Sequence, residues 1–252
     1  MLLTPKKQVK LIHRTSLELN GTSARELSKN QFNLIMRMVT TAFALFVCMS
    51  AFGCMSGGSV IGSGKEARET REVDNFTQLE LLGVGRIEVT IGNLRPLELS
   101  GDDNILPLIE TKVTDGKLVI RTMRSIRPVQ PLLIKATASD LTVIMLSGAG
   151  EIAVTGIAND NLHAEVPGAG EVTLSGQTNN LVLTLAGVGS VDARELVAKA
   201  VTVDMSGAGR TDVSPVVSLH VTITGAATVT YSGEPTITQK ITGVGKLKRR
   251  NK

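Results

Sequence analysis

The stretch Ser147-Gly148-Ala149-Gly150 is a short turn between two apolar segments, and close copies of it return at regular intervals through residues 141–245. The six copies occupy residues 147–150, 167–170, 186–189, 206–209, 224–227 and 242–245. Their first glycines are separated by 20, 19, 20, 18 and 18 residues. A nearly fixed period of this length is typical of a solenoid, in which each unit buries its apolar face against its neighbours.

Aligning the copies on their turns brings apolar residues into columns. Before the turns, the columns are Leu162, Leu181, Val201 and Leu219; Ala164, Leu183, Val203 and Val221; and Val166, Leu185, Met205 and Ile223. After the turns, the column is Ile152, Val172, Val191 and Val229. Aliphatic columns suit the inner wall of a parallel β-helix, whose coils stack about 4.8 Å apart. The sequence therefore predicts an all-β solenoid with about 18–20 residues in each coil.

Glycine is expected where the chain bends sharply between coils, because a side chain there would obstruct the turn or the coil above it. An earlier copy of the turn, Leu82-Gly83-Val84-Gly85, precedes a strand-like stretch at residues 87–91 and extends the pattern toward the N-terminus. The predicted structural turn glycines are Gly83, Gly85, Gly148, Gly150, Gly168, Gly170, Gly187, Gly189, Gly207, Gly209, Gly225, Gly243 and Gly245.

Between residues 68 and 131, apolar and polar residues alternate, which predicts short strands. Asp115-Gly116 stands between two of them and predicts a hairpin, because both central residues of a type I′ turn need positive φ. Residues 104–109 predict a connecting turn or a single helical turn, and residues 126–131 an irregular loop. The solenoid is therefore expected to include an N-terminal, hairpin-containing section.

The charge of the chain is unevenly divided. Residues 1–53 contain seven Lys and Arg against two Asp and Glu, a balance of +5, whereas residues 54–252 contain 20 against 21, a balance of −1. The basic pI therefore comes from the N-terminal segment and gives no support for nucleic-acid binding. Both cysteines, Cys48 and Cys54, belong to the N-terminal apolar segment, so residues 55–252 have no disulfide and no cysteine-ligated metal.

Residues 39–53 form an apolar run behind Arg37 that is shorter than the roughly 20 residues of a membrane span, which is the layout of a secretory signal. Met36-Arg37-Met38 would make a natural start for it. The chain is thus divided into a polar basic leader extension or misassigned start (1–35), a signal peptide (36–54), a flexible Gly/Ser tether (55–67) and the folded domain (68–252).

The signal ends in Ala51-Phe52-Gly53-Cys54, which resembles the lipobox of bacterial lipoproteins. In that class the cysteine thiol is acylated and the cysteine becomes the new N-terminus. The resemblance implies lipidation of Cys54 and, because Met55 and not Asp follows it, sorting to the outer membrane. Ala51 and Phe52 depart from the usual pattern, and the alternative is ordinary cleavage nearby with Cys54 unmodified.

Several motifs outside the signal are similar to those of the head-GIN-type putative auto-transporter adhesin family, over residues 62–248. They are the repeated turns, Gly62-Ser-Gly, Gly101-Asp-Asp-Asn-Ile-Leu-Pro-Leu-Ile-Glu-Thr, Tyr231-Ser-Gly-Glu-Pro and Thr242-Gly-Val-Gly-Lys. The resemblance implies a right-handed parallel β-helix of unknown biochemical activity, often behind a lipoprotein signal. Acidic residues commonly follow the turn in that family; here Glu151 and Glu171 do so, whereas Ser190, Arg210, Thr228 and Lys246 stand at the other copies.

Four features of the sequence are candidates for a site of chemistry. Residues 148–153 fit a G-x-G-x-x-A dinucleotide pattern, but a strand and not a helix is expected after them. His163 and His220 fall on outward positions three coils apart, about 14 Å, too far for a catalytic pair. Asp102-Asp103, next to Asn104, is the only acidic pair of the body and is expected to serve a turn.

Glu151 and Glu171 are expected side by side on adjacent coils, as a weak cation site or as a solvated surface. No catalytic residue, metal site or cofactor is predicted.

The sequence favours a non-catalytic, exported cell-envelope protein: a structural or adhesin-like binding module, expected as an outer-membrane lipoprotein. Its partners would be an unknown envelope or surface ligand, protein or polysaccharide, and the membrane through the lipid anchor; a homo-oligomer is left open. The alternative is a carbohydrate-active enzyme, a polysaccharide lyase or hydrolase, on the same scaffold. With no Trp and one Tyr, sugar stacking is poorly provided for.

The C-terminal run Lys246-Leu-Lys-Arg-Arg-Asn-Lys252 carries five positive charges. One interpretation is that it protects the exposed edge of the last coil from pairing with another chain. The other is that it attracts an anionic lipid or polysaccharide.

Overall fold

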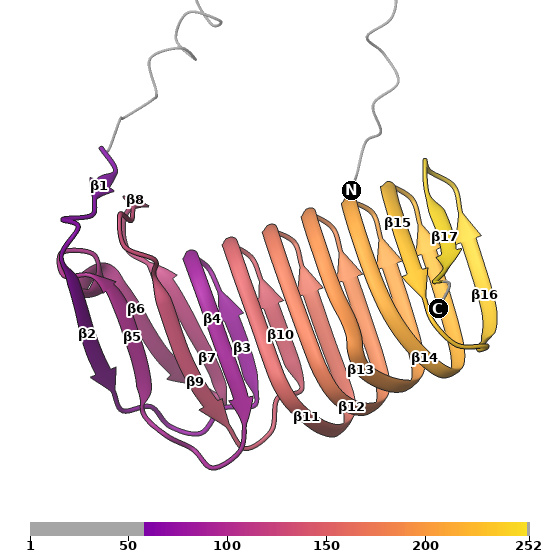
Figure 1. The fold of residues 1–252 in the computed structure, drawn as a ribbon, viewed down its shortest axis with the longest axis horizontal. Helices are drawn as coiled ribbons and strands as arrows, with labels where there is room; N and C mark the ends of the chain where they lie inside the picture. The colour runs from indigo at the N-terminus through magenta and orange to yellow at the C-terminus, as the bar shows by residue number, and fades with distance from the viewer. Residues whose placement is uncertain (1–57, 251–252) are drawn as a thin grey trace, which may run out of the picture. The chain divides into compact units, whose positions relative to one another are not determined.

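The computed structural model of the chain describes residues 58–250, which form one unit of stacked β-strands (Figure 1). Fifteen strands are hydrogen-bonded in one continuous sheet. Two short strands form a separate sheet in the N-terminal part of the domain. The predicted leader, the signal peptide and Cys54 lie outside the described residues. Within residues 58–250, no helix has the length and apolar character needed to cross a bilayer.

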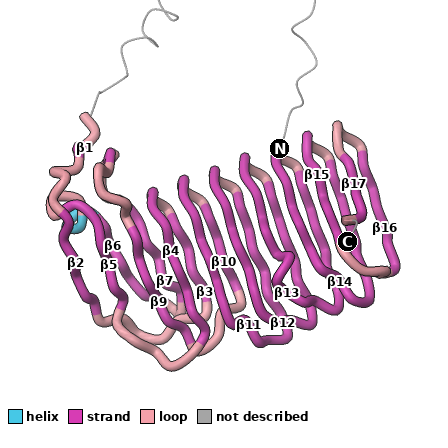
Figure 2. The backbone as a smooth tube through the Cα atoms, viewed as in Figure 1, coloured by secondary structure: helices cyan, strands magenta, loops and turns pink. Residues whose placement is uncertain are grey.

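Four long strands form the regular part of the stack. They are β11 (Ala149–Val166), β12 (Ala169–Leu185), β13 (Val188–Met205) and β14 (Ala208–Ile223). Each one pairs in parallel with the next. Each also runs from one glycine turn to the following one, so that loops interrupt this part of the chain mainly at the turns (Figure 2). The predicted all-β, parallel solenoid is therefore confirmed.

The predicted columns are confirmed in the strand register. Leu183, for example, pairs with Ala164 on one side and with Val203 on the other. All sixteen residues assigned to the four columns are at most 2% exposed. The column after the turns contains one further residue, Thr211, which pairs with Val191 and with Val229. The sequence alignment did not include it in the column because threonine is polar.

The stacking of the turns explains their glycines. A Cβ atom added to Gly148 would lie 2.0 Å from the carbonyl oxygen of Gly83, in the turn of the adjoining coil. The equivalent distances for Gly168, Gly187, Gly207, Gly225 and Gly243 range from 1.8 to 2.2 Å. Real Cβ atoms do not approach a backbone oxygen so closely, so any side chain at these positions would push two coils apart.

The coils do not all follow one another in chain order. The coil made by β3 (Gln78–Leu81) and β4 (Val84–Ile91) lies directly against β10 (Val143–Leu146) and the first half of β11. Its other side is covered by β7 (Lys117–Thr122) and β9 (Leu133–Ala138). The chain therefore makes the second coil of the stack before it makes the first.

An antiparallel section surrounds this first coil. β6 (Ile109–Thr114) forms a hairpin with β7, and β5 (Leu97–Asp102) pairs with β2 (Glu66–Arg71) and with β9. Asp115 and Gly116 have φ values of 52° and 73°, which confirms the predicted hairpin turn. The helical turn expected at residues 104–109 is present as a 3-10 helix, η1 (Leu106–Leu108).

Two segments are more ordered than expected. The first residues of the expected irregular loop at 126–131 form β8 (Ile126–Arg127), which pairs with β1 (Val60–Ile61). Because β1 lies inside the stretch expected to be a tether and β2 begins at Glu66, the ordered domain starts before residue 68.

The last coils complete the stack at the other end. β15 (Ala226–Tyr231) and β16 (Thr236–Ile241) pair with the two halves of β14. β17 (Lys246–Arg249) then pairs with β15, so the basic run near the C-terminus is itself a strand of the last coil.

Thr211 offers a test of the core. Its side chain is fully buried, and its hydroxyl oxygen has no hydrogen-bond partner among the described residues. An unsatisfied buried hydroxyl costs about 1–3 kcal/mol, so we expect Thr211→Val to raise the free energy of unfolding by about 1 kcal/mol in urea melts.

Thr178→Val is the matched control. The Thr178 side chain is only 5% exposed, but its hydroxyl donates to Oδ1 of Asn159 at 2.9 Å. Its replacement should lower the free energy of unfolding because the bond is lost. Equal destabilisation by the two substitutions would contradict the assignment of Thr211 as an unpaired group.

Candidate functional site

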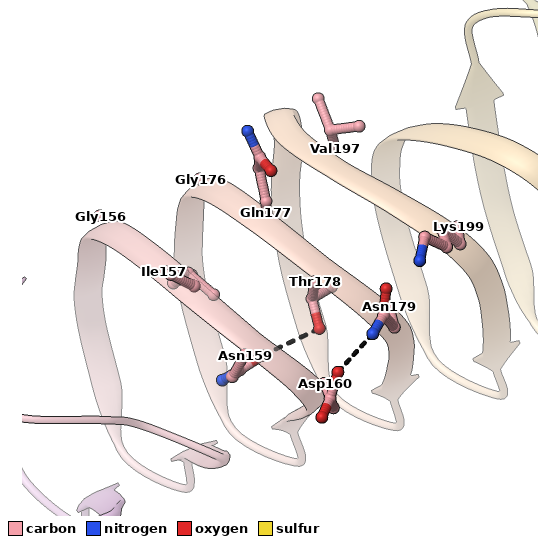
Figure 3. A pocket seen from close by; sticks show the side chains of 11 residues that line it. Gly156, Ile157, Asn159, Asp160, Gly176, Gln177, Thr178, Asn179, Val197 and Lys199 are labelled. Carbon is pink, nitrogen blue, oxygen red and sulfur yellow. Dashed lines mark hydrogen bonds between the residues drawn. The ribbon is translucent and has the colours of Figure 1, made fainter.

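The outer surface of the regular coils is hollowed on the side opposite the turns. The register of the long strands shifts there, between Val154 and Ile157 on β11 and between Thr173 and Ser175 on β12. Irregularities of this kind bend a strand and re-aim its side chains. The result is a narrow outer face in which residues from three successive coils lie side by side (Figure 3).

A shallow groove of about 640 Å³ lies on this face. We call it the amide groove, because amide side chains are prominent in it. It is lined by Gly156, Ile157, Ala158, Asn159, Asp160, Gly176, Gln177, Thr178, Asn179, Val197 and Lys199. Gly176 is essential to its shape: its φ is +128°, and a Cβ atom there would lie 2.2 Å from the carbonyl oxygen of Ile157.

The floor of the amide groove is fixed by hydrogen bonds. Nδ2 of Asn159 donates to the carbonyl oxygen of Leu141 at 2.8 Å, and Oδ1 of Asn159 accepts from the hydroxyl of Thr178 at 2.9 Å. Both side chains come from the inward positions of their strands. They hold adjacent coils together below the groove, as the dashed line between them in Figure 3 shows.

Two outward rows cross the amide groove. Ala158, Gln177 and Val197 form one row, since each pairs with the next in the strand register. Asp160, Asn179 and Lys199 form the other row, one from each coil. Nδ2 of Asn179 donates to a carboxylate oxygen of Asp160. The second row therefore places an acid, an amide and an amine in line, with no net charge.

The structure separates the residues that the sequence singled out for chemistry. Nε2 of His163 lies 3.4 Å from the hydroxyl oxygen of Thr184, whereas His220 is exposed three coils away in the same register. The glycines of residues 148–153 lead into β11 and not into a helix, so the phosphate-binding geometry is missing there. No group of three or more potential metal ligands occurs within residues 58–250.

Glu151 and Glu171 do lie side by side, as expected. The sequence reasoning missed the cation that accompanies them: Nη1 of Arg86 donates to Oε2 of Glu151 at 2.8 Å. Arg86 follows the early copy of the turn at residues 82–85, at the same position that Glu151 occupies in its own copy. Extending the alignment of the repeats to that copy would have found it.

Asp102 serves the fold, as the sequence indicated for this pair. Its buried carboxylate accepts from the backbone N–H groups of Gly64 at 2.7 Å, Val129 at 2.8 Å and Gln130 at 3.0 Å. Burial would raise the pKa of this carboxyl, but the three N–H donors outweigh burial and lower the pKa below its ordinary value of 3.8. Asp102 thus ties the segment after β1 to the segment after β8.

A second group of charges lies on the outer face of β13 and β14. Asp212 accepts from Nε of Arg210 at 2.6 Å and from Nη2 of Arg250 at 3.2 Å, and it pairs in register with Asp192. Burial opposes ionisation of Asp212, yet the two guanidinium groups lower its pKa. Arg194 in turn hydrogen-bonds to Asp192, which lowers the pKa of that carboxyl. Both acids are engaged in ion pairs, and the pair between Asp212 and Arg250, which follows β17, connects β14 to the last coil.

Comparison with known proteins gives a consistent result. Residues 75–235 match the family model described as "Putative auto-transporter adhesin, head GIN domain". The chain is similar to a putative adhesin of known structure from Bacteroides fragilis NCTC 9343, with 25% identity and a TM-score of 0.64 over 76% of this chain and 100% of that one. No curated protein matches it.

Two structures from Parabacteroides distasonis ATCC 8503 are similar in fold. One is a putative adhesin with 17% identity and a TM-score of 0.49. The other is a putative lipid binding protein with 16% identity and a TM-score of 0.50. Both alignments cover 77% of this chain and 100% of the other.

The three hydrogen bonds that the Asp102 carboxylate accepts, which we call the Asp102 clamp, predict a dependence of stability on pH. Because its pKa is lower in the folded chain, its contribution is complete above the ordinary value of 3.8 and is lost as the pH falls through the folded-state pKa. We expect Asp102→Asn to lower the urea midpoint at pH 7. The difference from the wild type should shrink as the pH is lowered below 3.8.

Asp115→Asn is the control at pH 7. Asp115 is exposed in the type I′ turn, where Asn-Gly is equally favourable. The urea midpoint of Asp115→Asn should therefore equal that of the wild type. A difference between Asp102→Asn and the wild type that stays constant from pH 7 to pH 2 would show that the charge of Asp102 does not stabilise the clamp.

Proposed function

The chain belongs to the head GIN domain family of putative auto-transporter adhesins, and we propose that it is a non-catalytic, adhesin-like binding module of the cell envelope. In this role the stack of coils acts as a rigid support. Its outward faces present rows of side chains to a surface ligand, protein or polysaccharide, because repeat folds create extended binding surfaces of this type.

The state of the acidic side chains carries this proposal. Hydrolysis of a glycosidic bond generally needs two carboxyl groups that face the same bond from opposite sides. In the described part of the chain, Glu151 is paired with Arg86, Asp212 with two arginines, and Asp102 with three backbone N–H groups. Carboxylates held in this way support binding and structure over catalysis.

The likeness to the Bacteroides fragilis structure supports the same role. The alignment covers 100% of the Bacteroides fragilis chain and 76% of this one, and the Bacteroides fragilis protein is a putative adhesin.

We further propose that the module is exported and anchored through Cys54 by a lipid, in the outer membrane. The sequence supports this through the apolar run at residues 39–53 and the Gly53-Cys54 junction. The tether in this arrangement is short, because β1 begins at Val60. The binding module would then be held close to the membrane surface.

Anchoring can be tested in a bacterial host that processes lipoproteins. We expect the wild-type chain to incorporate labelled palmitate and to sediment with membranes. Cys54→Ser should lose the label and leave the membrane fraction. Cys48→Ser is the matched control, because it changes the other cysteine of the same apolar segment and should keep both properties. Retention of the label by Cys54→Ser would exclude this residue as the anchor.

The binding role itself predicts adhesion without turnover. Cells that carry the full chain should adhere to immobilised envelope material more strongly than cells without it. The same cells, incubated with soluble polysaccharides, should release no new reducing ends or unsaturated products. Release of such products above that of control cells would favour the enzymatic alternative, whereas equal adhesion by both cell types would contradict the binding function.

A further inference from the structure

The amide groove contains polar groups that the fold leaves available. Gln177 makes no side-chain hydrogen bond, and Lys199 forms no ion pair, within residues 58–250. Asp160 accepts from Asn179 through one carboxylate oxygen, and its second carboxylate oxygen has no hydrogen-bond partner within the same residues. These groups lie on outward positions of three adjacent coils (Figure 3). A ligand in the groove could therefore reach all of them without breaking the fold.

The chemistry of these groups indicates the class of ligand. Gln177 both donates and accepts, Asp160 accepts, and Lys199 donates, so together they match groups that also do both, as hydroxyls do. The single negative and single positive charge cancel, so neither an anion nor a cation is favoured over a neutral ligand. The exposed side chains of Ala158 and Val197 add a small apolar surface beside them.

We propose that the amide groove binds a segment of neutral polysaccharide that lies along the stack, an assignment that rests on the proposed binding function. Successive coils are about 4.8 Å apart, so the row from Asp160 to Lys199 extends over about 10 Å, enough for more than one sugar ring. The floor is already fixed by the bonds of Asn159 and Thr178, so little ordering is needed when the ligand binds.

An extended peptide fits this groove less well. Peptides that bind to sheets commonly add a strand at an edge whose backbone N–H and C=O groups are free. The middle strand of the groove, β12, is paired on both sides by β11 and β13. Its backbone is therefore engaged, and recognition must come from side chains.

The test uses the full chain in detergent micelles, immobilised for biolayer interferometry. The probes are the neutral polysaccharides dextran, mannan, starch and arabinogalactan, with hyaluronate and dextran sulfate as charged comparators and a random peptide mixture as a third class. We expect binding to at least one neutral polysaccharide. Gln177→Ala/Lys199→Ala should weaken it about tenfold, the effect of losing two modest hydrogen bonds.

The matched control is Gln239→Ala/Lys135→Ala, which removes the same two side-chain types from exposed positions outside the groove. It should bind as the wild type does. All four side chains are on the surface, so circular dichroism and urea midpoints should stay unchanged and separate loss of binding from loss of folding.

Other outcomes would overturn the assignment. If the wild type and Gln177→Ala/Lys199→Ala bind a neutral polysaccharide equally, the groove is not the site. If only the charged polymers or the peptides bind, the ligand class is wrong. If no probe binds while cells carrying the chain still adhere to envelope material, the assignment fails and the proposed function stands. If adhesion is absent as well, both fail.

Discussion

The fold depends on how closely the backbones of successive turns approach each other. At each of the six turns from residue 147 onward, the first glycine lies directly against the carbonyl oxygen of the glycine in the adjoining turn. This contact allows neighbouring coils to keep their hydrogen-bond ladder while the chain reverses direction. The register at the turn then sets the register of both strands that leave it, and thus places Leu183 between Ala164 and Val203. The aliphatic core follows from the contact between turns.

This hierarchy explains what could be predicted from the sequence. The turn repeats with little variation, so the columns beside it could be aligned by counting residues. The step between turns varies from 18 to 20 residues, and the structure absorbs this variation on the opposite side of the coil, where the register shifts after Val154 and after Thr173. On that side, the number of residues from the turn no longer tells which residues of adjacent coils are paired. The amide groove lies on that side, and for that reason it could not be predicted from the sequence.

The other contacts that could not be predicted from the sequence share a physical cause. They join segments that are far apart in the sequence and meet only in the folded chain. Arg86 neutralises Glu151 from 65 residues away, and Asp102 collects its N–H donors from two loops. Neither contact has a local pattern. The pairing of β3 and β4 with strands on both sides depends in the same way on burial across the whole N-terminal section, which no single window of sequence contains.

The order of the first coils constrains how the domain can assemble. Residues 78–91 are synthesised early, yet both surfaces of the coil they form are covered by later segments, residues 117–138 on one side and residues from 143 onward on the other. Until those segments emerge, the edges of β3 and β4 have no partners, and the loops to be closed are long, which slows folding. Later coils each need only the coil before them. This topology therefore predicts a slow, collective first stage of folding, followed by the addition of one coil at a time toward the C-terminus.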